Sequence, residues 1–143
     1  DLVDLDFFVI AGAYTLLETR ALRRMLPLCE ERGIGVIAAA PYASGWLATD
    51  DKSATYMYGP ASPEIVERSL RMRAICDRHD VPIAAAALQF VLAHPMTATV
   101  IPGAKSAEEA IQNHRHLNTV IPEAVWRDFK EEELLDGLAP TPD

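Results

Sequence analysis

The chain has 143 residues, half of them hydrophobic, which is enough for a core of ordinary single-domain size. Its formal net charge of −8 and the scatter of its 13 basic residues argue against a nucleic-acid surface, so we expect no nucleic-acid partner. No apolar run could span a bilayer and no signal peptide is visible, so we expect no membrane partner. The two cysteines fit reduced core thiols, as in a cytoplasmic protein, so we expect a cytoplasmic location. The sequence starts at Asp1, which leaves a processed product, an excised fragment or a partly recorded chain open.

Three stretches predict β-strands. Asp6–Ala13 is a nearly continuous apolar run, Ile34–Ala40 is a second, and Thr97–Ile101 is rich in β-branched residues. A continuous apolar run, as opposed to an alternating one, is typical of a parallel strand covered on both faces. We therefore expect a parallel sheet.

Helices are predicted between and after these strands. Leu22 and Cys29 lie in a helical pattern that Pro27 either starts or kinks and that Gly33 ends. Pro82 occupies the place of a first helical residue, and the tail from Gly137 is expected to be loose. The further helices are expected over Pro63–His79, Ile83–Ala93, Ser106–His116 and Pro122–Leu135.

The order of elements is β-α-β-α-α-β-α-α, which predicts an α/β fold. Periodicity alone leaves open whether the sheet is open or closed. Three strands cannot close a barrel, and a lone three-stranded parallel sheet has two exposed edges. The sequence thus predicts that strands are missing or are supplied by a partner. Cys29 and Cys76 fall in helical patterns, which favours reduced core thiols over a disulfide or redox pair.

The segment from Thr97 to Asn113 suits an anion. The turn at Pro102 and Gly103 lets a ligand approach the backbone closely, and the helix that opens at Ser106 offers unpaired N–H groups at its positive end. Any strand followed by a helix supplies such an N-terminus, so this signal alone is weak.

The same segment resembles the cofactor signature that follows the last barrel strand of the aldo-keto reductases. The matching residues are Ile101-Pro102-Gly103-Ala104-Lys105-Ser106, Glu109, Gln112 and Asn113. The family has a (β/α)8 TIM barrel, and this segment holds the adenosine phosphate end of NADP or NAD. The resemblance therefore implies a nicotinamide cofactor.

Other stretches extend the resemblance over almost the whole chain. Residues 38–47 are similar to the loop after the seventh family strand, which normally reads Ala-Tyr-Ser-Pro-Leu-Gly-x-Gly-Leu-Leu, and residues 87–92 resemble the helix before strand eight. Residues 11–18, 56–58 and 76–82 resemble the aldose 1-dehydrogenases and L-fucose or L-galactose dehydrogenases. Residues 1–143 would then be the C-terminal part of the barrel, strands six to eight with their helices.

That assignment implies an oxidoreductase that transfers hydride between nicotinamide and a carbonyl or alcohol, with a small aldehyde or an aldose at C1 as substrate. The family's catalytic Asp, Tyr, Lys and His come from the first half of the barrel, and no residue here matches their motifs. We therefore assign no catalytic residue and expect this cofactor-binding half to be inactive without the amino-terminal half or a second copy. The alternatives are a non-catalytic cofactor-binding module of the same fold and an unrelated βα-layer protein.

The resemblance assigns cofactor contacts to two segments. In the first, Pro41–Gly45 would cross the pyrophosphate with backbone donors; in the second, Gln112 and Asn113 would hydrogen-bond the adenine, or form an exposed polar helix face. The assigned residues are Pro41, Tyr42, Ala43, Ser44, Gly45, Ile101, Pro102, Gly103, Ala104, Lys105, Ser106, Glu109, Gln112 and Asn113.

Ser106 and Glu109 also fit a capping box, in which Ser106 accepts from the Glu109 N–H and Glu109 reaches back. Glu109 stands where NADP-specific relatives place an arginine, so its carboxylate favours the free ribose hydroxyl of NAD. Lys105 could partly restore affinity for the 2′-phosphate or be a solvated surface residue.

Two positions depart from the family. Ala39 replaces the tyrosine that stacks on the nicotinamide, and Ala11 replaces the glutamine that holds its carboxamide. Tyr14 or Tyr42 could take over the stacking.

Aromatic residues supply a candidate substrate pocket. Trp46, Tyr56 and Tyr58 could present their faces to a sugar, although packing of a long loop explains them as well. The four histidines lack ligand spacing, so we predict no metal site.

Overall fold

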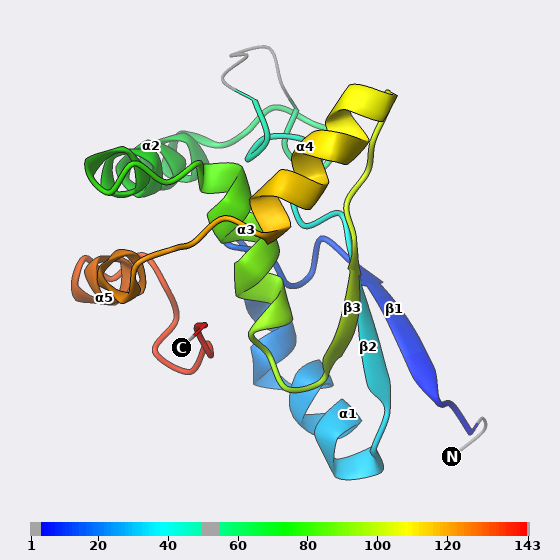
Figure 1. Ribbon diagram of the computed structural model, residues 1–143. Coiled ribbons are helices and arrows are strands. Elements are labelled where there is room, and N and C mark those ends of the chain that lie inside the picture. Colours follow the sequence, from blue (N-terminus) through cyan, green and yellow to red (C-terminus); the bar gives the residue numbers. More distant parts are fainter. Residues whose placement is uncertain (1–3, 50–54, 143) are drawn as a thin grey trace.

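The computed structural model describes residues 4–49 and 55–142, so part of the predicted 48–63 connection lies outside the described residues. The elements follow the predicted order, with a short 3-10 turn, η1, added before the first helix (Figure 1). They are β1 (Phe7–Ala11), η1 (Arg20–Arg23), α1 (Met25–Arg32), β2 (Gly35–Ala39), α2 (Pro63–Arg78), α3 (Ile83–Leu92), β3 (Thr97–Ile101), α4 (Ala107–Leu117) and α5 (Glu123–Glu131).

The three strands form one parallel sheet in the order β1-β2-β3, as the sequence predicts. Ala11 pairs with Ala39 and Ala39 pairs with Ile101, so the three strands end at one edge of the sheet. The pairing of β2 with β3 shifts between Val36 and Ile37. Because parallel strands need crossovers, each strand is followed by helical structure before the next strand begins.

The helices lie on one side of the sheet (Figure 1). On that side, Ile10, Val36 and Ala38 are buried against the hydrophobic core. The Ala-rich helix α3 runs through the middle of this layer, where its small residues allow close packing and Phe90 is fully buried. The prediction of a buried helix at this place is confirmed.

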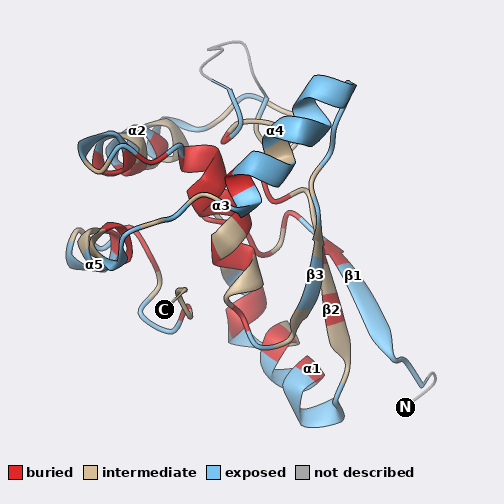
Figure 2. Ribbon diagram, in the orientation of Figure 1, coloured by how far each residue is buried: buried red, intermediate tan, exposed pale blue. Residues whose placement is uncertain are grey.

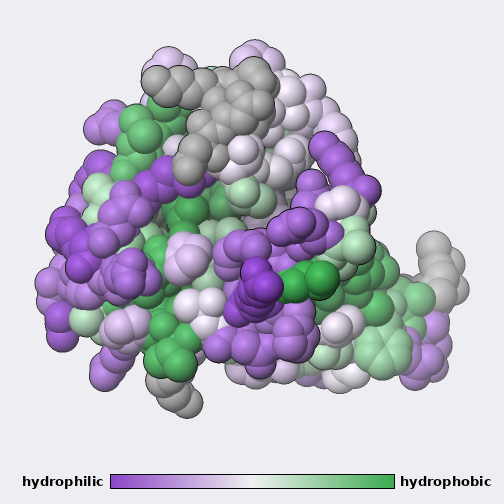
Figure 3. Space-filling view, turned by 45° about the horizontal axis from the view of Figure 1, so that its top comes forward, coloured by the Kyte–Doolittle hydropathy of each residue, from purple (hydrophilic) through white to green (hydrophobic). Residues whose placement is uncertain are grey.

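The other side of the sheet is bare in this chain. Phe7 is 59% exposed, Val9 is 57% exposed and Ile101 is 51% exposed. Figure 2 shows β1 largely exposed, and Figure 3 shows hydrophobic surface where the strands lie, at the right of the view. The expectation that β1 is covered on both faces is therefore wrong for the described chain, because all the helices pack on one side.

Helix ends differ from the prediction at the prolines. Pro82 and Pro122 are N-caps with extended ψ angles, and each helix starts one residue later. Pro27 lies in the first turn of α1, where its missing N–H costs no hydrogen bond, and Gly33 ends that helix in a left-handed conformation. Helix α5 stops at Glu131, four residues before the predicted end, and Glu133 has a positive φ angle.

The C-terminal segment is docked, which corrects the expectation of a loose tail. Ala139 is buried, and Arg23 forms a 2.6 Å ion pair with Asp136. The half-buried Arg68 on α2 donates from Nε to the carbonyl oxygen of Leu134 at 3.0 Å and from Nη1 to that of Leu17 at 3.2 Å. These contacts join the segment after α5 to α2 and to the loop after β1.

Two further observations concern the cysteines and the search for membrane-spanning helices. Cys29 and Cys76 are both free and buried, and burial raises the pKa of each thiol, which confirms the prediction of core thiols. Among the described residues, no helix has the length and apolar character needed to cross a membrane.

Candidate cofactor site

The loops that follow the strands meet at one edge of the sheet. The N–H of Ala40, just after β2, donates to the carbonyl of Ile101 at the end of β3 at 3.3 Å. The N–H of Gly12, just after β1, donates to the carbonyl of Ala39 at the same distance. The carboxyl edge of a parallel sheet is where barrel enzymes carry their sites.

A pair of side-chain hydrogen bonds joins two of these loops to α4. The Tyr42 hydroxyl donates to Oδ1 of Asn113 at 2.7 Å, and Nδ2 of Asn113 donates to the Gly103 carbonyl at 3.1 Å. Tyr42 is buried, and burial raises the pKa of its phenol to about 12, so it stays a neutral donor. The predicted arrangement, with α4 beside the Pro41–Gly45 loop at the end of β3, is confirmed.

This contact also limits what Asn113 can offer a ligand. One N–H and one lone pair of its amide are already used, so one of each remains. Because a phenol donates to Oδ1 and a carbonyl accepts from Nδ2, the orientation of the amide is fixed. The adenine contact assigned to Asn113 stays a prediction.

The N-terminus of α4 is capped as the sequence predicts, with one difference. Oγ of Ser106 accepts from the Glu109 N–H at 3.1 Å. The Glu109 carboxylate reaches back to the N–H of Lys105 at 2.6 Å, one residue before the position of a standard capping box. Two donors near the helix start are thus used within the protein, while Ala107 and Glu108 have N–H groups that donate to no other group in the described part of the chain.

The loop after β2 winds through several left-handed residues. Ala40, Ala43, Ser44 and Gly45 all have positive φ angles, which is uncommon for residues with a Cβ atom. A Cβ atom at Gly45 or at Gly103 would meet no atom within 4 Å, so both backbones face open space. A ligand can therefore approach the backbone at both loops, as the sequence predicts for these glycines.

The remaining predicted cofactor residues occupy two environments. Pro41 and Ala43 are buried within the β2 loop, whereas Ala104, Lys105 and Gln112 are exposed. Gln112 lies one residue from Asn113 but faces a different place, a pocket that it shares with His116 and the first turn of α3.

The predicted substrate aromatics are spread over the loops. Trp46 is partly buried and its carbonyl accepts from Arg73, and its buried Nε1 has no hydrogen-bond partner among the described residues. Tyr56 packs partly against the core, and burial together with nearby Glu18 raises the pKa of its phenol. Tyr58 is 92% exposed. Their role in a substrate pocket remains a prediction.

Tyr14 is a core residue. It is 1% exposed and its ring packs against Phe90 with centroids 5.1 Å apart and against His94 at 5.5 Å. A ring held in this way is not free to stack on a nicotinamide. Tyr42 lies at the carboxyl edge, but it is 6% exposed and its hydroxyl is bound to Asn113, so stacking by Tyr42 stays a prediction.

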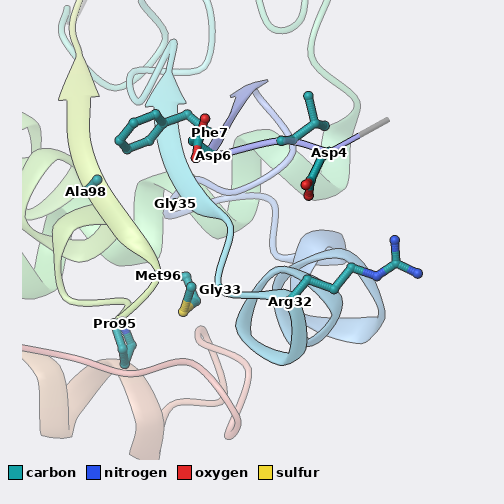
Figure 4. Close-up of a pocket in the computed structure, with 10 residues that line it drawn as sticks. Asp4, Asp6, Phe7, Arg32, Gly33, Gly35, Pro95, Met96 and Ala98 are labelled. Atoms are coloured by element: carbon teal, nitrogen blue, oxygen red, sulfur yellow. The ribbon is translucent and has the colours of Figure 1, made fainter. Parts of the chain in front are cut away.

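Another pocket lies at the opposite end of the sheet. It has a volume of about 680 Å³ and is lined by residues before β1 and β3 and after α1, with Phe7 and Gly35 beside it (Figure 4). This is the amino edge of the strands, away from the loops described above. Among the described residues, no group of three or more His, Cys, Asp or Glu residues could hold a metal ion.

The arrangement can be compared with known proteins. The family model described as "Aldo/keto reductase family" matches residues 3–133. The chain belongs to the aldo/keto reductase family. It is 38% identical over 141 residues to a D-threo-aldose 1-dehydrogenase of Pseudomonas sp., covering 97% of this chain and 42% of that protein. It is 35% identical over 133 residues to a pyridoxal 4-dehydrogenase of Microbacterium luteolum, covering 92% and 39%.

Solved structures agree on the fold. The aldo-keto reductase AKR11C1 from Bacillus halodurans, in its apo form, superposes with a TM-score of 0.67 at 21% identity, over 99% of this chain and 47% of that one. The holo form gives a TM-score of 0.63. The chain thus spans less than half of its relatives, and its parallel sheet with helices on one side is the C-terminal part of an aldo/keto reductase barrel.

Sequence reasoning missed two residues around this site, Arg73 and Gln89. Arg73 on α2 donates to the carbonyls of Trp46 and Thr49 at 2.8 and 2.7 Å, and it fixes the segment after β2. Gln89 on α3 donates to the carbonyls of His116 and Thr119 at 3.0 and 2.7 Å, which holds the C-terminal end of α4. No local pattern marks such long-range contacts to backbone carbonyls.

Proposed function

We propose that the complete protein is an NAD(P)-dependent oxidoreductase that interconverts a carbonyl and an alcohol, and that this chain holds the cofactor. The observation that carries the proposal is the junction of Tyr42, Asn113 and Gly103, which brings both predicted cofactor segments together at the carboxyl edge of the sheet. The family match and the relatives named as dehydrogenases support the reaction class.

The cofactor, when bound, would accept the hydride from the alcohol or aldose that is oxidised, and would donate it to the carbonyl in the reverse direction. The residues of this chain bind and orient it: the open backbone at Gly45 and Gly103 accommodates the phosphates, and the first turn of α4 offers the N–H groups of Ala107 and Glu108. These features fit a dinucleotide, since the half-buried Ser44 and Gly45, the exposed Gly103 turn and the start of α4 all follow strands that end at the same edge of the sheet.

The substrate is proposed to be a small aldehyde or an aldose oxidised at C1. The support is the relative named D-threo-aldose 1-dehydrogenase, which matches 97% of this chain. Trp46, Tyr56 and Tyr58 remain the candidates for contact with the sugar.

Catalysis is proposed to need residues outside this chain. The bare side of the sheet, with Phe7, Val9 and Ile101 exposed, suits the amino-terminal half of a barrel or a second copy of the chain. The isolated 143-residue chain should therefore self-associate and show no turnover. Sedimentation over a range of concentrations and an activity assay test this; a chain that stays monomeric at every concentration tested, or that turns over substrate, would contradict it. Dinucleotide binding without turnover in the full-length protein would point instead to a binding module.

Glu109 is proposed to make NAD at least as good a cofactor as NADP. A carboxylate next to the 2′-phosphate would repel it by about 1 kcal/mol in a solvated site and more if water is excluded. The bond from Lys105 N–H holds that carboxylate at the helix start.

The decisive measurement is kcat/KM with NAD and NADP for the full-length protein and for Glu109→Arg. We expect the substitution to shift preference towards NADP by about tenfold. Glu108→Arg is the matched control, because it makes the same charge change in the same exposed helical turn without touching the cap. Equal responses of the two variants would mean that Glu109 only caps its helix.

A further inference from the structure

A second pocket opens among the helices, away from the bare side of the sheet. It has a volume of about 500 Å³ and lies between the segment after β2, the C-terminal half of α2, the first turn of α3 and α4. The residues that matter for its chemistry are Arg73, Asp77, Ile83, Ala84, Gln112 and His116. The Pro41–Gly45 loop and the Gly103 turn do not line it.

His116 is the unusual group in this pocket. It is 9% exposed, and in the described part of the chain its imidazole makes no hydrogen bond or ion pair. The histidines at 79 and 94 do have partners, Asp128 at 2.8 Å and the Met96 N–H at 3.2 Å. The ring nitrogens of His116 are not among the buried side-chain atoms that lack a partner in the described residues, so they reach the open space of the pocket, where a ligand can bind them.

The first turn of α3 adds donors to the same wall. Its N-cap is Pro82, whose side chain has no hydrogen-bond acceptor to cap the helix. The N–H groups of Ile83 and Ala84 donate to no group within the described residues. Helix α3 has ten residues, so its N-terminus carries a partial positive charge next to these donors. Burial lowers the pKa of His116, so the ring is neutral near pH 7 and offers one N–H of its own.

The charges on α2 decide which ligand fits. Arg73 and Asp77 are four residues apart on that helix and both line the pocket, so their charges largely offset each other. Three N–H donors and a helix start then favour an oxyanion, while Asp77 provides an acceptor for a hydroxyl group attached to it. The volume is larger than a bare phosphate needs.

We propose that this pocket binds a phosphate group, either free or as the monoester of a small hydroxylated molecule, through His116 and the first N–H groups of α3. The proposed contacts, His116 and the first turn of α3, are not among the residues assigned to the cofactor, although Gln112, which is assigned to the adenine, also lines this pocket. It predicts that inorganic phosphate and glucose 6-phosphate shift the same resonances, and that the ester binds more tightly if its hydroxyl groups reach Asp77.

The test is an NMR titration of the full-length protein, labelled at histidine and alanine, with inorganic phosphate and with glucose 6-phosphate at pH 7.5. We expect saturable shifts of the His116 ring and the Ala84 amide. His116→Phe, which keeps the volume but removes the donor, should weaken binding about tenfold, whereas His116→Gln should retain most of it. His114→Phe is the matched control, because His114 is exposed on the same helix and does not line the pocket.

Each outcome decides the proposal. Tighter binding of the ester identifies a phosphorylated small molecule, and equal affinities identify free phosphate. Shifts that do not saturate, shifts confined to other residues, or equal weakening by His116→Phe and His114→Phe would overturn the site. A melting curve of each variant separates loss of binding from loss of fold.

Discussion

The two sides of the sheet differ sharply although they are made from the same strands. On the helical side, Ile10, Val36 and Ala38 are buried under α1 and α3. On the other side, Phe7, Val9 and Ile101 lie open, and the Phe7 ring sits across Gly35, where an added Cβ atom would be 2.8 Å from it. The strands carry apolar residues on both sides. The chain covers one side with its own helices, and the other side is suited to an interface.

The largest effect should come from matched substitutions on the two sides. Phe90→Ala removes a ring that is 0% exposed and leaves a cavity, so it should lower the free energy of unfolding by about 3–5 kcal/mol. Phe7→Ala removes the same ring from the bare side, where Phe7 is 59% exposed, and should cost less than about 1 kcal/mol at concentrations below those at which the chain self-associates. Urea unfolding of both variants measures the difference; equal costs would mean that the bare side is covered.

The next effect tests how firmly the C-terminal segment belongs to the helical side. Arg68→Met keeps the aliphatic stem but leaves the carbonyls of Leu134 and Leu17 without their donor, so we expect a loss of about 2 kcal/mol. Arg71→Met is the control: Arg71 lies on the same helix, is exposed, and donates to Glu132. If both variants unfold at the same urea concentration, the segment is not held by Arg68.

Tyr42 lies in the loop after β2, at the carboxyl edge of the sheet. Tyr42→Phe removes only the hydroxyl that donates to Asn113, and it should cost about 1 kcal/mol and weaken dinucleotide binding severalfold. The reason is that the substitution removes the side-chain hydrogen bond that joins α4 to the loop after β2. Tyr58→Phe, at an exposed position, should change neither quantity. Dinucleotide affinity that is unchanged in Tyr42→Phe would separate this link from the cofactor site.

The smallest effect is expected at the outer surface of the helical side. The hydrogen bond from His79, with Arg127 and Arg78 nearby, holds the pKa of Asp128 below its usual value. A carboxylate with a lowered pKa stabilises the fold above its ordinary pKa, and this contribution is lost as the pH falls through the lowered value.

Melting temperatures between pH 6 and pH 3 test this contribution. Asp128→Asn should be less stable than wild type at pH 6, and the two should converge in acid. Glu131→Gln is the control on the same helix, since the ion pair that Glu131 forms with Arg127 is 3.9 Å long and exposed. A constant gap between wild type and Asp128→Asn across this range would exclude the predicted linkage.

The sequence by itself determined the order of the elements and the family. Apolar runs and helical spacing are local, so three strands and the main helices could be placed, and Gly33 and the Ser106 cap act within a few residues. The Pro102–Gly103 turn and the residues up to Asn113 carried the family resemblance, which the comparison confirmed.

Only the tertiary structure decided which parts of the chain touch. Tyr42 and Asn113 are 71 positions apart, Arg23 and Asp136 are 113 apart, and the pairing of each depends on how whole layers pack. Periodicity called β1 a strand covered on both faces, because an apolar run is the same whether its cover comes from this chain or from another. Whether a strand is buried depends on which layers pack against it. A local sequence pattern cannot show whether such a layer belongs to this chain or to another.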